Sequence, residues 1–169
     1  MIESIEKQSL NLKNLELIIS DDGSSDGTPK IVSDWSAKTS FEIKYIKQKN
    51  KGPGAARNTG IRESSGNWVA FIDSDDIWSE NKIIEKIKII KSNSKLNFIC
   101  HNEIFIDLYG NKEKLDYCSK YSNDKPLLKQ LYCRNLFSTS AVICKKSLFD
   151  KIGGFDEKLM SSQDYDLWL

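Results

Sequence analysis

Two short apolar runs in this chain each end in a group of carboxylates. Residues 15–20 (LELIIS) precede the first group and residues 68–72 (WVAFI) precede the second. The carboxylates are Asp21, Asp22, Asp73, Asp75 and Asp76. Apolar runs of this length are typical of strands buried on both faces of a sheet. Ligands of open α/β sheets bind outside the carboxyl ends of strands, so both acidic groups are expected on one rim.

Helical and strand-like patterns alternate along the chain. Helices are predicted at residues 1–7, 28–37, 55–63, 79–91, 127–132, 148–152 and from 164 onward, and further strands at residues 41–45, 97–100, 104–108 and 140–144. The polar segment 109–136 is predicted to be irregular apart from its short helix. This alternation predicts an α/β fold whose sheet has a parallel portion.

The charge balance argues against one class of partner. The 169 residues include 25 Lys and Arg against 24 Asp and Glu, which gives a net charge of +1, and 39% of the residues are hydrophobic. Such a composition is typical of one globular domain and gives no basis for a nucleic-acid partner. No apolar run approaches the ~18–20 residues that a transmembrane segment requires.

The cysteines and lysines bear on location. The chain has four cysteines, which are Cys100, Cys118, Cys133 and Cys144. They form no C-x-x-C pair and follow no secretory leader, which predicts reduced cytoplasmic thiols. One predicted helix carries four lysines, which are Lys82, Lys86, Lys88 and Lys91. These lysines are expected on its solvent face, and peripheral attachment to the inner face of a membrane stays open.

Clustered carboxylates repel each other, and something must offset that repulsion. At ~5 Å two like charges repel by about 1 kcal/mol in water and by several kcal/mol in a cleft. A solvated loop would suffice, because Asp and Ser are ordinary turn residues. The alternative is a bound cation. If residues 71–75 stay extended, Asp73 and Asp75 project to the same side, and two carboxylates with phosphate oxygens suit Mg²⁺ or Mn²⁺.

A glycine-rich stretch between the acidic groups has features of an anion site. Residues 49–60 (KNKGPGAARNTG) have small side chains that leave the backbone amides accessible at a predicted helix start. Amide donors at such a position favour an anion, and Arg57 adds a guanidinium. An ordinary loop-to-helix turn explains the stretch equally well. It is neither a dinucleotide-binding motif nor a P-loop, since Arg57 replaces the third glycine and Gly-Lys-Ser/Thr is absent.

Four blocks of the sequence together resemble one enzyme family. They are LELIISDDGSSDGTPKIV, NKGPGAARNTGIRESSGNWVAFIDSDDIW, STSAVICKKSLFDKIGGFDEKL and SQDYDLWL. In order and spacing they resemble glycosyltransferase family 2, the inverting enzymes of the GT-A fold, over residues 2–169. The resemblance implies a Rossmann-like, mixed and mostly parallel sheet flanked by helices. It implies a single catalytic domain with a nucleotide-binding half at 1–96 and an acceptor-side half at 97–169.

The resemblance also implies which residues bind a nucleotide sugar. Asp21 and Asp22 would lie beside the base, and Arg57 would help to hold the nucleotide. A UDP-sugar is the leading candidate for the donor. The implied acceptor is a hydroxyl of a glycan or of a lipid-linked molecule, in the synthesis of polysaccharides or glycoconjugates.

A metal site and a catalytic base follow from the same resemblance. Asp73, Ser74 and Asp75 would form the D-x-D motif that meets ribose and a Mn²⁺ or Mg²⁺ ion, and Asp76 would share in the metal site. Asp164 would take the proton from the acceptor hydroxyl in a single inverting displacement. The preceding residue of this chain is Gln, where the family commonly has Glu.

The chain departs from the family pattern at both ends. Family members usually begin with a hydrophobic strand that lies in the middle of the sheet, and they continue beyond the position of Leu169. Loss of the first strand is expected to leave unpaired backbone groups on two neighbouring strands, each costing ~1–3 kcal/mol when buried. The 169-residue chain alone is therefore expected to be feeble or inactive in sugar transfer.

Two other functions are kept as alternatives. A nucleotidyltransferase also combines a Rossmann-like sheet with acidic metal ligands. It needs a basic, glycine-rich loop near the first strand end, and residues 21–28 (DDGSSDGT) contain no Lys or Arg. A non-catalytic remnant that binds nucleotide or a partner chain would keep the fold without the chemistry.

Overall fold

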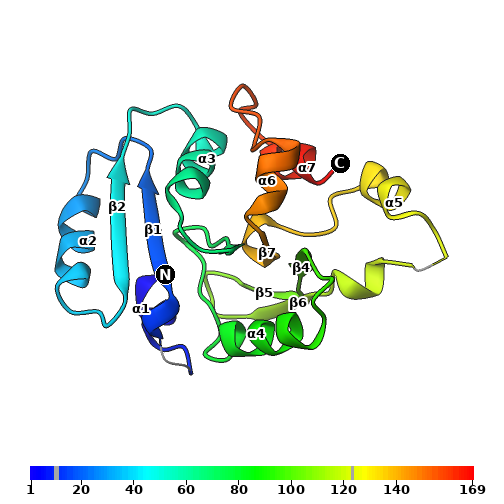
Figure 1. The fold of residues 1–169 in the computed structure, drawn as a ribbon, viewed down its shortest axis with the longest axis horizontal. Helices are drawn as coiled ribbons and strands as arrows, with labels where there is room; N and C mark the ends of the chain where they lie inside the picture. Colours follow the sequence, from blue (N-terminus) through cyan, green and yellow to red (C-terminus); the bar gives the residue numbers. More distant parts are fainter. Residues whose placement is uncertain (10–11, 123) are drawn as a thin grey trace.

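The first two strands form a parallel pair on one side of the molecule (Figure 1). The structure, a computed structural model, describes residues 1–9, 12–122 and 124–169. β1 (Glu16–Asp21) pairs with β2 (Glu42–Lys47) along its whole length. The crossover between them contains α2 (Thr28–Ser36), which packs against β2. The strand–helix–strand unit predicted at the start of the chain is confirmed.

A second sheet joins strands from distant parts of the chain. β7 (Val142–Lys145) lies in its centre and pairs antiparallel with β3 (Trp68–Ala70) and with β4 (Phe98–Cys100). The mixed α/β architecture is thus confirmed, but the sheet is not mostly parallel among the described residues: β1 pairs parallel with β2, whereas the pairings of β3 and β4 with β7 are antiparallel. Residues 1–96 and 97–169 share this second sheet, and their division into nucleotide and acceptor halves stays a prediction.

The other helices pack around the two sheets. They are α1 (Ile2–Glu6), α3 (Pro53–Glu63), α4 (Lys82–Ser92), α5 (Leu127–Cys133), α6 (Ser147–Ile152) and α7 (Gln163–Trp168), with 3-10 turns at Leu12–Asn14, Cys118–Lys120 and Thr139–Ala141. α3 begins where Gly52, at φ +90°, redirects the chain and Pro53 fixes the first helical φ. Because α3 contacts both β1 and α7, it links the first sheet to the last helix.

Some predicted boundaries are wrong. β5 (Glu103–Ile106) confirms the strand predicted at residues 104–108, but its antiparallel partner β6 (Lys112–Leu115) lies inside the segment that the pattern predicts to be irregular. β6 reads KEKL and is largely exposed, so it lacks the apolar alternation of a half-buried strand. α4 begins at Lys82 rather than at Ser79, because the intervening residues form a turn in which Lys82 N donates to Ser79 O at 3.0 Å.

Two clusters of buried side chains stabilise the sheets. One lies around β1 and includes Ile5, Leu17 and Trp78. The other lies around β7 and includes Phe71 and Val142. Removal of apolar surface from water drives the formation of both clusters, at about 25 cal/mol per Å². The cluster around β1 also packs against Ala70 of β3, so the two cores meet between the sheets.

β1 and β3 each keep one free edge. Within the described part of the chain β1 pairs with β2 alone and β3 with β7 alone, and no backbone hydrogen bond joins β1 to β3. The prediction that two strands would have unpaired backbone groups is therefore confirmed.

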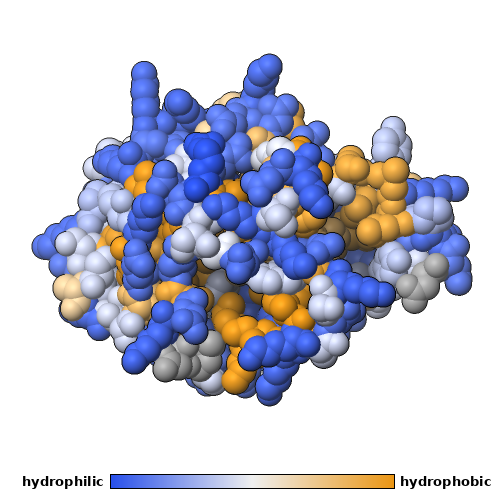
Figure 2. Space-filling view, viewed as in Figure 1, coloured by the Kyte–Doolittle hydropathy of each residue, from blue (hydrophilic) through white to orange (hydrophobic). Residues whose placement is uncertain are grey.

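Hydrophilic side chains cover most of the face seen in Figure 2. Apolar side chains gather over α5, where Leu127 and Leu128 are 47% and 60% exposed. Across residues 1–9, 12–122 and 124–169, no helix combines the length and the apolarity that crossing a membrane requires.

Candidate functional site

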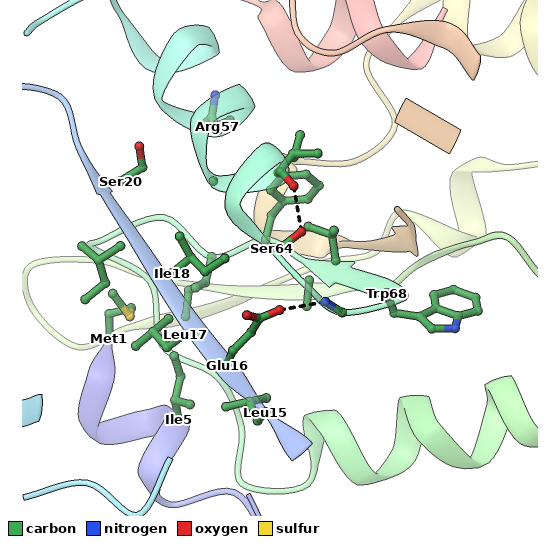
Figure 3. A pocket seen from close by; sticks show the side chains of 18 of the residues that line it. Met1, Ile5, Leu15, Glu16, Leu17, Ile18, Ser20, Arg57, Ser64 and Trp68 are labelled. Carbon is green, nitrogen blue, oxygen red and sulfur yellow. Dashed lines mark hydrogen bonds between the residues drawn. The ribbon is translucent and has the colours of Figure 1, made fainter. Parts of the chain in front are cut away.

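β1 and β3 run in the same direction, with their starts tied together. The Glu16 carboxylate, at the start of β1, accepts hydrogen bonds from Ser65 N (2.6 Å) and Gly66 N (2.8 Å), just before β3 begins (Figure 3). Burial alone would raise the pKa of Glu16, but these hydrogen bonds outweigh it and lower the pKa. At the opposite ends, Asp22 after β1 accepts a hydrogen bond from Gly52 N just before α3, and Asp73 after β3 pairs with Arg57 of α3. Both acidic groups therefore lie at one rim.

A cavity of about 730 Å³ lies between β1 and β3. Figure 3 shows Ile18 and Leu17 of β1 along its length, with Ser20 and Arg57 towards the rim. Asp22 and Asp73 also line this cavity. The rim therefore opens onto the space between the two sheets.

Asp21 is buried at the end of β1 and is bonded to the protein itself. Its carboxylate accepts hydrogen bonds from Ser24 N (2.7 Å) and from the hydroxyl of Tyr45 on β2. Burial alone would raise the pKa of Asp21, but the bonds from Tyr45 and Ser24 outweigh it and lower the pKa. In return, the Asp21 carboxylate raises the pKa of Tyr45 to about 12. Asp21 is therefore an ionised group held in place by β2.

Asp22 shapes the loop that precedes α3. Its Oδ1 accepts hydrogen bonds from Gln48 Nε2 (2.8 Å) and Lys51 N (2.9 Å), and its Oδ2 accepts one from Gly52 N (2.7 Å). These bonds give the backbone donors of the loop a charged acceptor. Asp22 thereby joins the end of β1 to the start of α3.

Replacing Asp22 with Asn should lower the free energy of unfolding by about 1–3 kcal/mol, because one backbone N–H of the loop loses its acceptor. Urea denaturation followed by circular dichroism measures the change. The matched control is Asp34→Asn at an exposed position of α2, where a change within about 0.5 kcal/mol is expected. Equal stabilities of the two variants would show that the loop does not depend on Asp22.

Arg57, in the second turn of α3, reaches the other acidic group. Its Nη2 lies 2.9 Å from Asp73 Oδ1, and its side chain is only 20% exposed. The guanidinium also lies over the Phe155 ring, 5.5 Å from the centroid. Ion pairs at the surface contribute little stability. The main effect of this pair is to fix one positive charge at an otherwise acidic rim.

The acidic residues after β3 form a turn, so the expected extended segment is wrong. β3 ends at Ala70, and Asp76 N donates to Asp73 O at 3.1 Å around Ser74 and Asp75. Alternation of side chains holds only along an extended strand. The expectation that Asp73 and Asp75 project to the same side, with Ser74 turned away, therefore loses its basis.

The rim does not contain a ready-made metal cage. Among the residues that the structure describes, no group of three or more His, Cys, Asp or Glu side chains is placed to hold a metal. Asp73 is paired with Arg57, whereas Asp75 is exposed and has no partner in the described residues. Mg²⁺ commonly takes one or two carboxylates together with substrate phosphates. This donor set fits an ion that arrives with a phosphate ligand.

Asp164 lies in the first turn of α7, and its hydrogen-bond partner is not one of the rim residues. Its Oδ2 accepts a hydrogen bond from Asn135 Nδ2 at 3.2 Å. The helix is fixed by Tyr165, whose hydroxyl donates to Leu131 O at 2.7 Å. The neighbouring Gln163 is buried and packs near the start of α3, with its Cγ 3.5 Å from the position that a Cβ on Gly54 would take. α7 thereby reaches the helix that carries Arg57.

Ser140 and Lys82 support the Asp73 turn, and the sequence pattern reveals neither. Ser140 Oγ accepts a hydrogen bond from Asp73 N (2.9 Å), and Lys82 Nζ donates to Ser140 O (3.0 Å). The solvent-facing position predicted for Lys82 is wrong. Lys82 is 6% exposed, because its ammonium lies over the Trp78 ring, 4.3 Å from the centroid. Desolvation lowers the pKa of Lys82 to about 7.

Asn58 on α3 fixes the turn that contains Gly154. Its Nδ2 donates to Phe155 O (2.8 Å) and to Glu157 Oε1 (2.9 Å), and its Oδ1 accepts from Phe155 N (2.8 Å). The two segments approach so closely that a Cβ on Gly154 would lie 2.1 Å from Asn58 Oδ1. Asn58 thereby places the Phe155 ring beneath the Arg57 guanidinium.

Solved structures establish the class of fold. The structure is similar to that of Staphylococcus aureus TarS 1–349 in complex with UDP-GlcNAc, with a TM-score of 0.77 and 22% sequence identity. The alignment covers 99% of this chain and 47% of the TarS chain. The same protein in complex with UDP gives a TM-score of 0.70 at 21% identity and covers 99% of this chain and 48% of the other. This likeness concerns the fold, which is the GT-A fold of glycosyltransferases.

Sequence comparison establishes the family. Residues 1–153 match Glycosyl transferase family 2, and the chain belongs to that family. An uncharacterized glycosyltransferase of Rickettsia prowazekii is 33% identical, over 92% of this chain and 49% of its own length. The putative glycosyltransferase EpsH of Bacillus subtilis is 35% identical, over 80% of this chain and 38% of its own length. The chain thus spans about half, or less, of the length of these curated relatives.

Proposed function

We propose that this chain provides the nucleotide-sugar site of a glycosyltransferase that moves a sugar from a nucleoside-diphosphate sugar, foremost a UDP-sugar, to an acceptor hydroxyl with inversion. One observation carries the proposal: the rim combines the Arg57–Asp73 ion pair, at 2.9 Å, with an Asp75 that has no partner among the described residues. A cation and a free carboxylate at strand ends suit a diphosphate that arrives with a divalent ion. Family membership supports the same class of ligand.

The nucleotide would lie between the first acidic group and α3. We assign Asp21 and Asp22 to the wall beside the base, where their hydrogen bonds to Tyr45 and to Gly52 N keep that wall in place. Arg57 would offer its guanidinium to a phosphate oxygen, since planar guanidinium groups bind phosphate with two parallel hydrogen bonds.

A Mn²⁺ or Mg²⁺ ion would arrive with the diphosphate and be held by one or two carboxylates from the set Asp73, Asp75 and Asp76, with Ser74 at the tip of their turn. When bound, such an ion neutralises the charge that develops on a departing diphosphate. The protein's own contribution is to hold the turn, through the hydrogen bond from Asp73 N to Ser140 Oγ.

Asp164 would accept the proton of the acceptor hydroxyl. Asn135 Nδ2 binds its Oδ2, which orients the carboxylate and leaves Oδ1 for the acceptor. One base suffices for a one-step displacement that inverts the anomeric carbon. The acceptor would be a glycan or a lipid-linked molecule, in polysaccharide or glycoconjugate synthesis at the inner face of the membrane.

Replacing Asp75 with Ala should weaken metal-dependent binding of UDP. Calorimetric titration of UDP in the presence of Mn²⁺ should show binding to the wild-type chain, and the affinity should fall by about tenfold or more in the variant, because a charged ligand of the ion is lost. The matched control is Asp34→Ala on α2, which should bind as the wild type does. UDP binding that is equal in all three proteins, or that ignores Mn²⁺, would contradict the proposal.

A further inference from the structure

A second pocket, of about 610 Å³, lies beside α5. We call it the α5 pocket. Its lining comes from Lys120, at the end of a 3-10 turn, from residues 122 and 124–126 of the following loop, and from α5 with its C-cap. It shares no residue with the rim or with the cavity between β1 and β3. The proposed sugar-nucleotide site therefore leaves the α5 pocket without a role.

The α5 pocket concentrates positive charge. Its basic lining residues are Lys120, Lys125, Lys129 and Arg134. Asp124 is the one acidic residue that lines it in the described part of the chain. Cations elsewhere, such as Lys44 and Arg57, pair with carboxylates, but none of these four forms an ion pair with a described residue. Because an anionic ligand would relieve the mutual repulsion of the four cations, their gathering favours such a ligand.

The Gln130 side chain of α5 fixes the shape of the pocket. Its Nε2 donates to Ser122 O and to Lys125 O, both at 2.8 Å, and its Oε1 accepts from Ser122 N at 2.8 Å. Arg134 Nη2 donates to Lys120 O at 3.0 Å, which joins the 3-10 turn to the end of the helix. The cations are thus held around one space before a ligand binds, and this preorganisation lowers the cost of binding.

An apolar stripe of α5 adjoins the pocket. It consists of Leu128 and Tyr132, which are 60% and 77% exposed. Residues four apart lie on the same face of a helix, so this stripe runs beside that of Lys129 and Cys133, which line the pocket. Figure 2 shows the apolar side chains that gather over α5. A ligand that fits both features has an apolar chain next to its anionic group.

The α5 pocket is joined to the helix that carries Asp164. Asn135, the residue after Arg134, donates from Nδ2 to Asp164 Oδ2 at 3.2 Å. The Tyr165 hydroxyl donates to the backbone of α5 at Leu131 O (2.7 Å) and Tyr132 O (2.9 Å). A ligand that is anchored in the pocket can therefore extend towards Asp164.

We propose that the α5 pocket and its apolar stripe bind a phosphate group that is attached to an apolar chain. Phosphate oxygens accept hydrogen bonds from several ammonium groups and from a guanidinium at once. Inorganic phosphate would leave the stripe exposed, and a neutral amphiphile would leave the cations without a counter-charge. On the basis of the proposed function, we assign this ligand as the acceptor: the pocket anchors its phosphate while a hydroxyl of the same molecule meets Asp164.

Octyl phosphate, used below its micellar concentration, is the probe, and inorganic phosphate and octyl glucoside are its controls. In NMR titrations of the ¹⁵N-labelled full chain, octyl phosphate should shift the backbone amides of Lys129 and Arg134 and the side-chain amide of Asn135. Inorganic phosphate should bind about tenfold more weakly, since burial of about two methylene groups supplies that factor. Octyl glucoside should leave these signals unchanged.

Two exposed residues of α5 separate the contributions of charge and chain. Lys129→Glu reverses a charge in the pocket and should weaken binding of both phosphates by about tenfold. Leu128→Ser should weaken binding of octyl phosphate by about threefold or more and leave that of inorganic phosphate unchanged. The matched control is Lys88→Glu on α4, which should bind both as the wild type does. All three positions are exposed, so folding should persist.

Three results would overturn the proposed site. Equal affinities for octyl phosphate and inorganic phosphate would remove the apolar chain from the ligand, and equal affinities for octyl phosphate and octyl glucoside would remove the phosphate. Binding that Lys129→Glu leaves unchanged would place the ligand elsewhere, such as at Arg57.

The assignment as acceptor has a readout of its own. Octyl phosphate that shifts the pocket amides but not the Asn135 side chain would overturn it. The titration needs neither UDP nor Mn²⁺, so a failure of UDP binding would refute the proposed function and leave the phosphate site standing.

Discussion

Replacing Gly154 with Ala should lower the free energy of unfolding by about 3 kcal/mol or more. The new Cβ would lie 2.1 Å from Oδ1 and 2.8 Å from Cγ of Asn58. Asn58 can withdraw only by giving up its hydrogen bonds to Phe155 and Glu157, which leaves buried backbone groups unpaired. Urea denaturation followed by tryptophan fluorescence measures the loss.

A double-mutant cycle isolates the clash. In the background of Asn58→Ala, which removes the obstructing atoms, Gly154→Ala should cost less than about 1 kcal/mol. The two changes should therefore couple by about 2 kcal/mol. A cost that is the same with and without the Asn58 side chain would show that the backbone at Gly154, and not the contact, opposes the substitution.

Replacing Lys82 with Met should remove a strong dependence of stability on pH. In the folded protein desolvation lowers the pKa of Lys82 from 10.5 to about 7. Between these values the unfolded chain binds one proton more than the folded chain, so the free energy of unfolding rises with pH, by about 1.4 kcal/mol per pH unit. Below pH 7 both states are protonated, and the full penalty for the buried charge applies.

The comparison should be made at pH 7 and pH 10 by urea denaturation. Relative to Lys82→Met, the wild type should gain about 3 kcal/mol over this interval. Other groups that titrate there, such as tyrosines, cancel because both proteins contain them. Lys88→Met, at an exposed position of the same helix, should follow the wild type. A wild-type curve parallel to that of Lys82→Met would mean that the lysine stays charged.

The elements of the fold could be predicted where the local pattern is strong. The apolar run of β1 with its following aspartates predicts that strand at its observed place, and α3 is predicted at residues 55–63 although it begins two residues earlier, at Pro53. β6 could not be predicted, because an exposed polar hairpin strand has no core-facing side. The pairing of β3 with β7 could not be predicted either, because the two strands are more than 70 residues apart in sequence, from Ala70 to Val142.

The sequence predicts which residues gather at the rim, but it predicts their arrangement only in part. The strand-end rule brings both acidic groups to one rim, and Arg57 joins them there. The turn at Asp73 was not predicted, because its support comes from distant groups such as Ser140 and Lys82. Asn58 was missed for the same reason, since its partner Phe155 lies 97 residues away.

The tie between the starts of β1 and β3 has a mechanical consequence. At that end the sheets are joined by the Glu16 carboxylate, and at the other end α3 joins them, through Asp22 to its first residues and through Arg57 to Asp73. The cavity is thereby bounded by β1 and β3 on its two long sides, by the Glu16 hydrogen bonds at one end and by α3 at the other. Neither sheet can swing away from the other without breaking one of these joints, so the two should melt as one cooperative unit.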